Sequence, residues 1–228
     1  MNCDHDLFLA LNFDGGPLLD CTMLAVSGTL LWVPLYLLIL WLVWRRTGTR
    51  GLVLFLVLMI GAVGLADMIA GIFKHNGLLG GLLPDFDPRW RPMFTPSLEG
   101  LDIAPDSLRA LRRMTPEALA AAGYDPAGWN VHVPAEAVSG RYGTVSAHAA
   151  TIAALALLSA ATIRRRWFTA LIVCCTALIC YSRIYLAKHF PADIAWGLGL
   201  GMLLGGAAWI TLRRLTRRTR TEEPADHL

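Results

Sequence analysis

Charged residues are scarce in this chain of 228 residues. They make up 16% of the sequence, against roughly 25% in a soluble domain, while 55% is hydrophobic and the mean hydropathy is +0.51. This composition excludes an ordinary soluble enzyme and favours a protein that crosses a membrane several times. The formal net charge of +3 is small, and we expect neither a nucleic-acid partner nor a protein partner.

Lysine is nearly absent, and the sequence has no cysteine–histidine spacing typical of a metal site. The two lysines, Lys74 and Lys188, both fall at predicted helix ends. Three of the five cysteines lie inside an apolar run, where a free thiol behaves as a small hydrophobe, while a Cys3–Cys21 disulfide is an alternative for the others. We therefore predict no metal and no cofactor. The acidic amino-terminal segment also argues against a cleavable signal peptide.

Apolar stretches predict about five transmembrane helices. The expected spans are about 23–44, 51–73, 144–163, 167–186 and 192–212. A kink is expected at Pro34 in the first span. Before it, residues 1–20 combine a short apolar stretch with four aspartates and no lysine or arginine, and they predict an interfacial helix. The predicted fold is an all-α integral membrane bundle, formed by a single domain over residues 1–212.

The segment 75–143 interrupts this pattern with eight prolines and many acidic residues. It predicts a long extramembrane loop with short helices at 105–113 and 116–122. After the last span, residues 213–228 form a basic and then polar tail, and we expect 221–228 to be disordered.

Arginines predict the orientation of the bundle in the membrane. The short connections at 45–50 and 164–166 and the tail hold eleven of the twenty basic residues. By the positive-inside rule, their side is the cytoplasm. The amino terminus, the long loop and the segment 182–193 then face the opposite, outer side, which in a bacterium is the periplasm. We expect a multi-pass protein of the bacterial inner membrane.

The segment 182–193 places clustered ionisable residues where a membrane helix should end, which is costly without a function. Pro191 marks a helix start, so His189 precedes that helix and Asp193 lies in its first turn. Asp193 can accept a hydrogen bond from one ring nitrogen of His189 and leave the other nitrogen free for chemistry. Arg183 can bind a phosphate through its forked guanidinium.

These residues form the pattern SRxxxxxHxxxD, which resembles the third signature of the type 2 phosphatidic acid phosphatase (PAP2) superfamily. Ser182, Arg183, His189 and Asp193 fill every defined position. The pattern is long and its gaps are fixed, which makes a chance match improbable.

A second signature of that superfamily, PSGH, corresponds to the sequence VSAH. Ser146 and His148 match, while Val145 and Ala147 replace the proline and the glycine. Ser146 is a good N-cap for the third span, and the start of a helix attracts phosphate. His148 then lies in the first turn, where it can give a proton to a leaving oxygen.

The first signature, KxxxxxxRP, is matched in residue type and order but not in spacing. Lys74 ends the second span, and sixteen residues instead of six separate it from Arg91 and the following proline. Arg89 is an alternative to Arg91, although only Arg91 precedes a proline.

The resemblance implies an all-helical fold whose three signatures meet at one end, and a phosphatase mechanism without metal. His189, oriented by Asp193, attacks phosphorus and forms a phosphohistidine, and His148 protonates the leaving oxygen. The phosphate-binding residues implied by the match are Lys74, Arg91, Arg183 and Ser146.

Four further residues could support the site. Ser182 belongs to the third signature, and Asp67 lies seven residues before Lys74 on the same helical face. Asp67 can pair with Lys74 or with an arginine of the site, or form a structural buried pair. Arg141 and Tyr142 can touch the substrate head group or lie at a solvated loop edge.

The expected substrate is a lipid phosphate or diphosphate in the bilayer. The acidic amino-terminal segment and the spread of the signatures are similar to bacterial homologues that dephosphorylate lipid A. Undecaprenyl diphosphate and phosphatidylglycerophosphate are the alternatives. Vanadium-dependent haloperoxidases share the signature residues but are soluble. A head-group binding protein with a defective site is the non-enzymatic alternative, based on the altered first signature.

Overall fold

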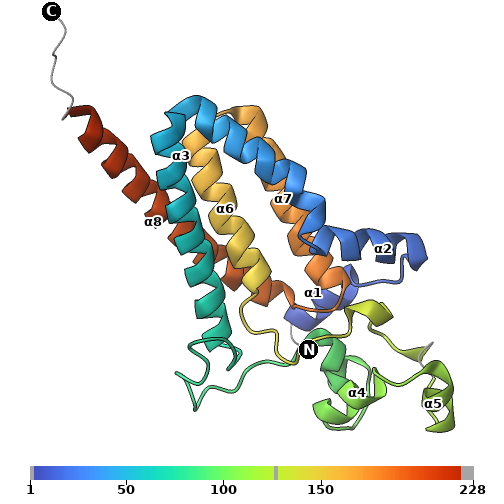
Figure 1. Cartoon of the computed structure of the whole chain (residues 1–228). Helices are drawn as coiled ribbons and strands as arrows, with labels where there is room; N and C mark the ends of the chain where they lie inside the picture. The colour runs from blue at the N-terminus through green and yellow to red at the C-terminus, as the bar shows by residue number, and fades with distance from the viewer. Residues whose placement is uncertain (1–2, 126–127, 222–228) are drawn as a thin grey trace, which may run out of the picture.

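The computed structural model describes residues 3–125 and 128–221, with side chains as far as Arg217, and it is built from helices (Figure 1). The α-helices are α1 (Cys3–Leu11), α2 (Gly16–Ser27), α3 (Val33–Ile72), α4 (Pro105–Leu111), α5 (Pro116–Ala121), α6 (Ala147–Ile163), α7 (Arg166–Tyr185) and α8 (Pro191–Thr221). Short 3-10 helices are η1 (Leu30–Trp32), η2 (Pro92–Phe94), η3 (Pro96–Leu98) and η5 (Ala135–Ala137). The described residues form no strand beyond an isolated bridge between Trp90 and Tyr142, which confirms the predicted all-α class.

Three helices in the described part of the chain are long and apolar enough to cross a membrane. They are Leu30–Ile72, Arg166–Tyr185 and Pro191–Arg217. The helix α6 is also apolar but shorter, with 17 residues. Because α3 is bent into two arms, the bundle contains one helical segment for each of the five expected spans. The architecture is that of a membrane helical bundle, as predicted.

The bend in α3 lies at Gly48, which has φ 71° and ψ −177°. This backbone conformation is open almost only to glycine, because a side chain would clash with the backbone. The connection predicted at 45–50 is therefore this single sharp bend, and arginines flank it on both sides. Apolar side chains of both arms, such as Val43 and Phe55, pack into one cluster with Leu158 of α6.

The first predicted span begins too early, and the predicted kink is wrong. The helix α2 ends at Ser27, and Gly28 is extended there, with φ −84° and ψ 163°. The chain then passes through η1 before α3 starts. Pro34 lies in the first turn of α3, where no intrahelical N–H donor is needed. Proline therefore starts this helix instead of bending it.

A stripe of glycines lets α8 approach α6 closely. The stripe consists of Gly197, Gly201 and Gly205 of α8, and the nearest backbone oxygens belong to Ser146, the N-cap of α6, and to Ala150 and Ala154. A Cβ atom added at Gly201 would lie 2.1 Å from the carbonyl oxygen of Ala150. Small residues at four-residue spacing are the usual means by which membrane helices approach this closely. The contact fixes the start of α6 beside the start of α8.

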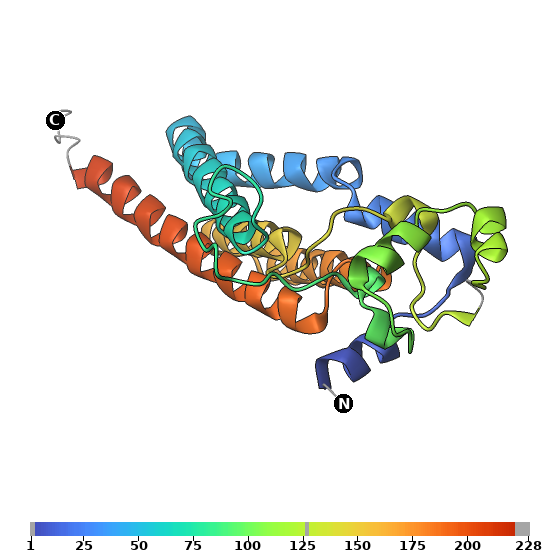
Figure 2. The ribbon, with the colours of Figure 1, turned by 90° about the horizontal axis from the view of Figure 1, so that it is seen from below.

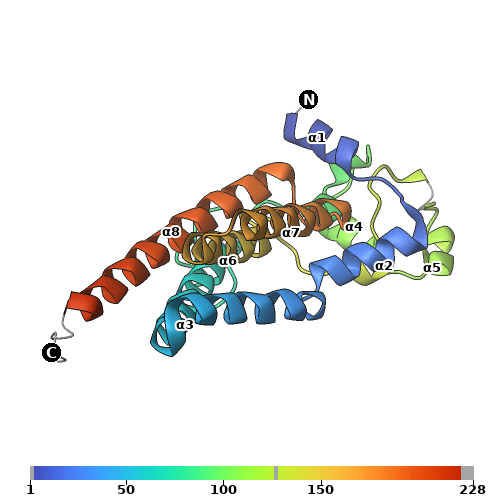
Figure 3. The same ribbon diagram turned by 90° about the horizontal axis from the view of Figure 1, so that it is seen from above.

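The helix α1 is docked against the start of α8 (Figures 2 and 3). Phe8 is fully buried, and its ring centroid lies 5.4 Å from that of Phe190. His5 stacks on the same ring at 4.9 Å, and Asp4 accepts a hydrogen bond of 2.9 Å from the backbone N–H of Ala192. The amino-terminal helix is thus fixed to the bundle, and its interfacial position stays a prediction.

The connections of the bundle sort to two opposite ends (Figure 1). One end, called here the loop end, holds the segment 75–143 and the turn between α7 and α8. The other, called the arginine end, holds the Gly48 bend, the turn between α6 and α7 and the last turns of α8. Within the loop end, α4 and α5 confirm the two predicted short helices.

The helix α8 continues past the predicted end of the last span near residue 212. Arg213, Arg214 and Arg217 are helical, and the helix runs to Thr221. Arginine is a good helix former, so the basic composition marks the membrane boundary and not the helix end. The views from below and above show these last turns diverging from the neighbouring helices (Figures 2 and 3). The disorder predicted for 221–228 falls, beyond Thr221, outside the described residues.

Candidate active site

His189 lies in the turn between α7 and α8 and is almost completely buried. Burial and the charges of Lys74, Arg183 and Arg91 lower the pKa of His189 well below its ordinary value, against a raising effect of its bond to Gly143. The ring is therefore neutral at neutral pH. Its Nδ1 atom lies 2.8 Å from the Gly143 carbonyl oxygen. A carbonyl can only accept, so Nδ1 carries the proton and Nε2 keeps a lone pair for nucleophilic attack.

Asp193 does not form the direct hydrogen bond to His189 that the sequence predicts. Its Oδ2 atom lies 3.9 Å from Nδ1, too far for such a bond, because the Gly143 carbonyl occupies that position. Oδ2 instead accepts a 3.0 Å hydrogen bond from the backbone N–H of Phe190. The Asp193 carbonyl also accepts a 2.9 Å bond from the Ser146 N–H. Asp193 therefore links the starts of α6 and α8 and leaves a negative charge beside the histidine.

Arg183 lies in the last turn of α7 and is only 4% exposed. Its Nη1 donates a hydrogen bond to the hydroxyl of Ser27, at the end of α2. Its Nε is buried without a hydrogen-bond partner in the described structure. An unpaired buried donor is costly unless a ligand satisfies it. The neighbouring Ser182 is buried too, and its hydroxyl donates to the carbonyl of Ile179 at 2.7 Å, which is a helix contact.

Arg91 is held in place by the loop that precedes α6. Its Nη1 donates to the Ser139 carbonyl at 2.6 Å, and its Nε donates to the Tyr142 carbonyl at 3.2 Å. Gly140, which has φ 67°, passes so close that an added Cβ would lie 2.5 Å from the guanidinium carbon. The backbone thereby presents this cation in a defined orientation without neutralising its charge.

Arg89, the alternative to Arg91, has a different place. Its Nη1 lies 2.5 Å from Asp4 of α1 and 3.8 Å from Oδ1 of Asp193. Its guanidinium carbon stands 3.6 Å from the centroid of the Phe190 ring. Arg89 therefore ties α1 to the start of α8, while Arg91 faces the cavity described below.

The predicted N-cap at Ser146 is confirmed. Its hydroxyl accepts a hydrogen bond of 3.4 Å from the backbone N–H of Ala149, and the side chain is fully buried. His148 follows in the first turn of α6 and is exposed. Val145, just before the cap, has φ 52°, a strained conformation for a β-branched residue. Such strain concentrates at functional sites, and here it directs the chain into α6.

A cavity of about 390 Å³ lies at the loop end beside these groups, although His189 itself is not among its described lining residues. Its lining residues are Leu24, Ser27, Gly28, Arg91, Ser139, His148, Arg183 and Lys188. Among the described lining residues, three cations and one imidazole thus border a single cavity, and no carboxylate does. Fixed positive charge of this kind binds a phosphate group and stabilises the charge that develops during its transfer.

Lys74 lies two residues after the end of α3 and is partly buried. Burial and the charges of Arg91 and Arg183 lower the pKa of Lys74 to about 8, although Asp193 and Asp67 raise it. Lys74 is therefore within electrostatic reach of the same cations and of His189, even though it does not line the cavity. Lys74 and Arg91 therefore interact electrostatically despite the wide gap between them in the first signature.

Lys188 is a cavity residue that the signatures do not assign. Its Nζ lies 3.3 Å from the hydroxyl of Ser139, and it borders the cavity together with Arg183. Burial, Arg183 and Arg91 lower the pKa of Lys188 to about 8. It occupies an undefined position of the third signature. The sequence feature that could have indicated Lys188 is the rarity of lysine, since the chain has only two.

A second, largely apolar cavity of about 340 Å³ adjoins the first. Both cavities are bordered by Ser27, Gly28 and His148. Asp67 lines the apolar cavity from the second arm of α3, and Trp32 lines it from η1. The structure thus places Asp67 beside the site and not within its group of cations. The pair of cavities can hold a phosphate at one end and an apolar group at the other.

The loop residues Arg141 and Tyr142 match the second of their two alternatives, a position at the edge of the loop. Arg141 forms an ion pair with Asp106 and lies 5.0 Å from the ring centroid of Trp90. Tyr142 contributes its carbonyl oxygen to Arg91. Neither side chain lines the cavity.

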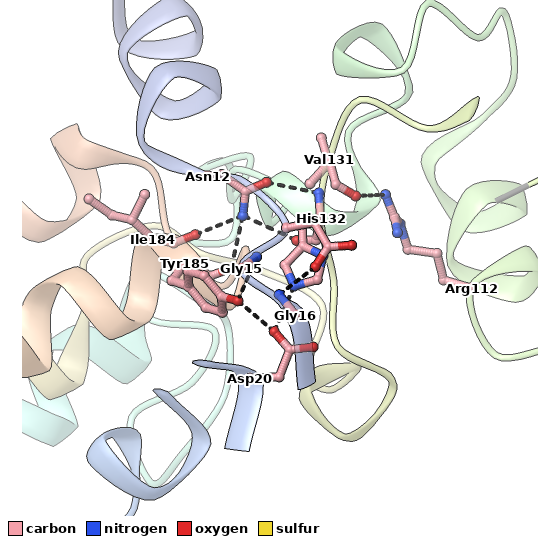
Figure 4. A network of polar contacts seen from close by, with 10 residues as sticks. Asn12, Gly15, Gly16, Asp20, Arg112, Val131, His132, Ile184 and Tyr185 are labelled. Carbon is pink, nitrogen blue, oxygen red and sulfur yellow. Dashed lines mark hydrogen bonds and ion pairs between the residues drawn. The ribbon is translucent and has the colours of Figure 1, made fainter. Parts of the chain in front are cut away.

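One group in the described chain has the composition of a metal site, and it lies outside the cavity. Figure 4 shows two of its members, Asp20 and His132. Asp14, Asp20 and His132 offer ligand atoms within 4.8 Å of one another. In the structure, Nε2 of His132 lies 2.8 Å from Asp20, which also accepts a 2.6 Å bond from the Tyr185 hydroxyl. Asn12 donates to the carbonyls of His132 and Tyr185 at 3.1 and 2.8 Å. The group therefore belongs to a network that joins the amino-terminal segment, the long loop and α7.

Comparison with known proteins gives a consistent result. The family model of the PAP2 superfamily matches residues 69–217, which include all three predicted signatures. The chain is 25% identical over 223 residues to a lipid A 4'-phosphatase of Bacteroides thetaiotaomicron, covering 97% of this chain and 83% of the relative. It is 27% identical over 205 residues to a lipid A 4'-phosphatase of Porphyromonas gingivalis, covering 90% and 71%. No solved structure matches the chain.

Proposed function

The chain belongs to the PAP2 superfamily and is a lipid phosphatase, and we propose that it removes the 4'-phosphate of lipid A through a phosphohistidine intermediate. The substrate is inferred from the names of two relatives that align with nine tenths or more of the chain. One observation carries the mechanism. His189 has its Nδ1 tied to the Gly143 carbonyl and its Nε2 free, beside fixed cations.

In the first step, Nε2 of His189 attacks phosphorus, and the bond from phosphorus to the sugar oxygen breaks. His148 gives its proton to that leaving oxygen. Arg91 and Arg183 hold the phosphoryl oxygens, whose charge is spread in the transition state. The imidazole acquires positive charge as it is phosphorylated, and the Asp193 carboxylate 3.9 Å from Nδ1 stabilises that charge.

In the second step, His148 takes a proton from a water molecule, whose oxygen attacks phosphorus. The bond between phosphorus and Nε2 of His189 breaks, and inorganic phosphate leaves. Both histidines are then in their starting states. The same two residues thus exchange the roles of nucleophile and leaving group, and of acid and base.

The adjoining cavities suggest how a lipid is bound. The phosphate lies among Arg91, Arg183 and Lys188, and the apolar cavity beside His148 receives the neighbouring part of the lipid. The loop end faces the periplasm in this proposal, because the arginine clusters of the opposite end favour the cytoplasm. The protein then acts from the inner membrane on lipid in the outer leaflet.

The test is turnover of defined lipids by the purified full-length protein. Lipid A with both phosphates, undecaprenyl diphosphate and phosphatidylglycerophosphate are compared by phosphate release, and the lipid A product is mapped by mass spectrometry. We expect the highest kcat/KM on lipid A, with loss of the 4'-phosphate alone. A higher kcat/KM on either other lipid, or loss of the 1-phosphate, contradicts the substrate proposed here.

The same assay tests the role of the cations. Because side chains supply the positive charge, we expect activity to persist in excess EDTA. Orthovanadate, which mimics five-coordinate phosphorus, should inhibit. Complete loss of activity in EDTA, restored by magnesium, contradicts the mechanism.

A further inference from the structure

The arginine end lies opposite the turn between α7 and α8, which carries His189 (Figure 1), and it contains a cavity of about 480 Å³. It lies between the Gly48 bend, the end of α6 and the last described turns of α8. The arginines that line it are Arg46, Arg164, Arg213 and Arg217. They come from three segments that are far apart in the sequence and that the fold brings together.

Arginine supplies every charge among the described lining residues of this cavity. Four guanidinium groups border it, together with three threonines, and no aspartate or glutamate is among its described lining residues. Like charges gathered around one space repel each other, and the repulsion is relieved when an anion enters. Guanidinium groups fit phosphate oxygens through two parallel hydrogen bonds. The cavity therefore has the chemistry of a phosphate site.

Two of the arginines have contacts that restrict their side chains. Nη1 of Arg46 donates a 2.8 Å hydrogen bond to the carbonyl of Ile163, at the end of α6. The guanidinium carbon of Arg213 stands 5.6 Å from the ring centroid of Trp209. Held side chains lose less conformational entropy when they bind a ligand.

The remaining walls favour a lipid over a free ion. Ala161, Leu212 and the Trp209 ring line the same cavity, which opens between helices at the ends of apolar spans. Tryptophan and arginine are typical of the level at which lipid head groups lie. Basic pockets between transmembrane helices at this depth bind the head groups of anionic lipids. We propose that this cavity binds the phosphate head group of an anionic phospholipid, separately from the substrate site.

Neighbouring arginines provide matched controls. Arg45 precedes Arg46, and Arg214 follows Arg213, and neither lines the cavity. An Arg46→Gln, Arg213→Gln variant and an Arg45→Gln, Arg214→Gln variant remove the same charge from the same helices. If the arginines serve only as general membrane anchors, the two variants must behave alike.

The experiment measures binding of phosphatidylglycerol and phosphatidylcholine to the full-length protein in detergent by native mass spectrometry. We expect tighter binding of phosphatidylglycerol, and about a tenfold or larger loss of that affinity in the Arg46→Gln, Arg213→Gln variant only. Equal affinity for the two lipids, or equal losses in both double variants, overturns the proposal. The readout is independent of phosphatase activity.

Two further measurements test whether Arg213 contributes by itself and whether the ligand is a lipid. Arg46 also binds a helix-end carbonyl, so the single variant Arg213→Gln, which keeps that contact, must by itself weaken phosphatidylglycerol binding. A large excess of inorganic phosphate is added as a competitor. Displacement of phosphatidylglycerol by phosphate would show a general anion site and overturn the assignment to a lipid. Retention of the lipid supports it.

Discussion

At the scale of single residues, the orientation of His189 depends on the backbone and not on a side chain. The Gly143 carbonyl holds Nδ1, and no point substitution can delete a carbonyl oxygen. The loop that carries Gly143 is fixed on both sides, because its N–H donates to the Arg89 carbonyl at 2.8 Å and the following Thr144 hydroxyl accepts from the Arg89 N–H at 2.7 Å. The tautomer of His189 is therefore a property of the fold.

Replacing His189 tests its proposed role as the nucleophile. His189→Ala should lower kcat by about a thousandfold or more, since loss of a nucleophile removes the covalent route. His75→Ala is the matched control, because His75 lies at the same end and contacts the Leu83 carbonyl outside the cavity. It should retain activity. Phosphate release by both variants is compared after their thermal midpoints have shown that they fold. An active His189→Ala enzyme excludes this residue as the nucleophile.

The two lysines predict how activity depends on pH. Lys74 and Lys188 each have a pKa lowered to about 8, chiefly by burial, so both lose their positive charge at a lower pH than an ordinary lysine. Since kcat/KM reports the free enzyme, it should fall as the pH rises through about 8. The Lys74→Arg, Lys188→Arg variant keeps its charge, and its fall should shift to higher pH. An unshifted fall means that another group controls the alkaline limb.

At this scale the sequence predicted the residues that the third signature specifies by type and spacing. Arg183, His189 and Asp193 stand at fixed spacing, and the structure places them around one turn. The contact of Asp193 was predicted incorrectly, because a backbone carbonyl competes for Nδ1 and leaves no mark in the sequence. Lys188 was overlooked as a site residue because it occupies a position that the signature leaves undefined.

At the scale of helices, the α6–α8 contact determines whether the second and third signatures meet. Gly201 lies in the middle of this contact, where the Ala150 carbonyl leaves no room for a side chain. The Ser146 N–H and the Asp193 carbonyl form a hydrogen bond of 2.9 Å at the end of the same interface. Close helix packing and the geometry of the site therefore depend on the same few glycines.

The glycine stripe can be tested with one methyl group. Gly201→Ala should lower both the thermal midpoint and kcat, because the added Cβ would lie 2.1 Å from a backbone oxygen and would force α8 away from α6. Gly199→Ala adds the same methyl to the same helix where nothing lies within 4 Å, and it should leave both quantities unchanged. Differential scanning fluorimetry and phosphate release give the two readouts. Equal effects of the two substitutions contradict the close contact.

Helix positions were predicted well where long apolar runs end in charged or proline residues. The expected spans 144–163 and 167–186 differ from α6 and α7 by only a few residues. The start of the first span failed because the run 23–44 is apolar throughout, and Gly28 interrupts the helix without interrupting the hydropathy. The kink at Pro34 was predicted because the same apolar run conceals the end of α2 at Ser27. A proline bends a helix only where a helix already precedes it.

At the scale of the whole molecule, the separation of the loop end from the arginine end predicts which surface is accessible from outside the cell. In a background with Cys3 and Cys21 replaced by serine, Ser97→Cys at the loop end should react with a membrane-impermeant thiol reagent in intact cells. Thr49→Cys at the Gly48 bend should react only after lysis. Both positions are exposed in the structure, so access alone distinguishes them. The opposite pattern would invert the orientation.

The bend at Gly48 also bears on biosynthesis. Both arms of α3 are complete once residue 72 has been made, and their apolar side chains share a cluster, so contacts between segments near in sequence can form early. Because the two arms are joined at Gly48 without a loop, one arm cannot enter the lipid long before the other. We expect the arms to be released from the translocon as one helical hairpin. This hairpin would then serve as the template on which α6 and α8 assemble after the long loop has been synthesised.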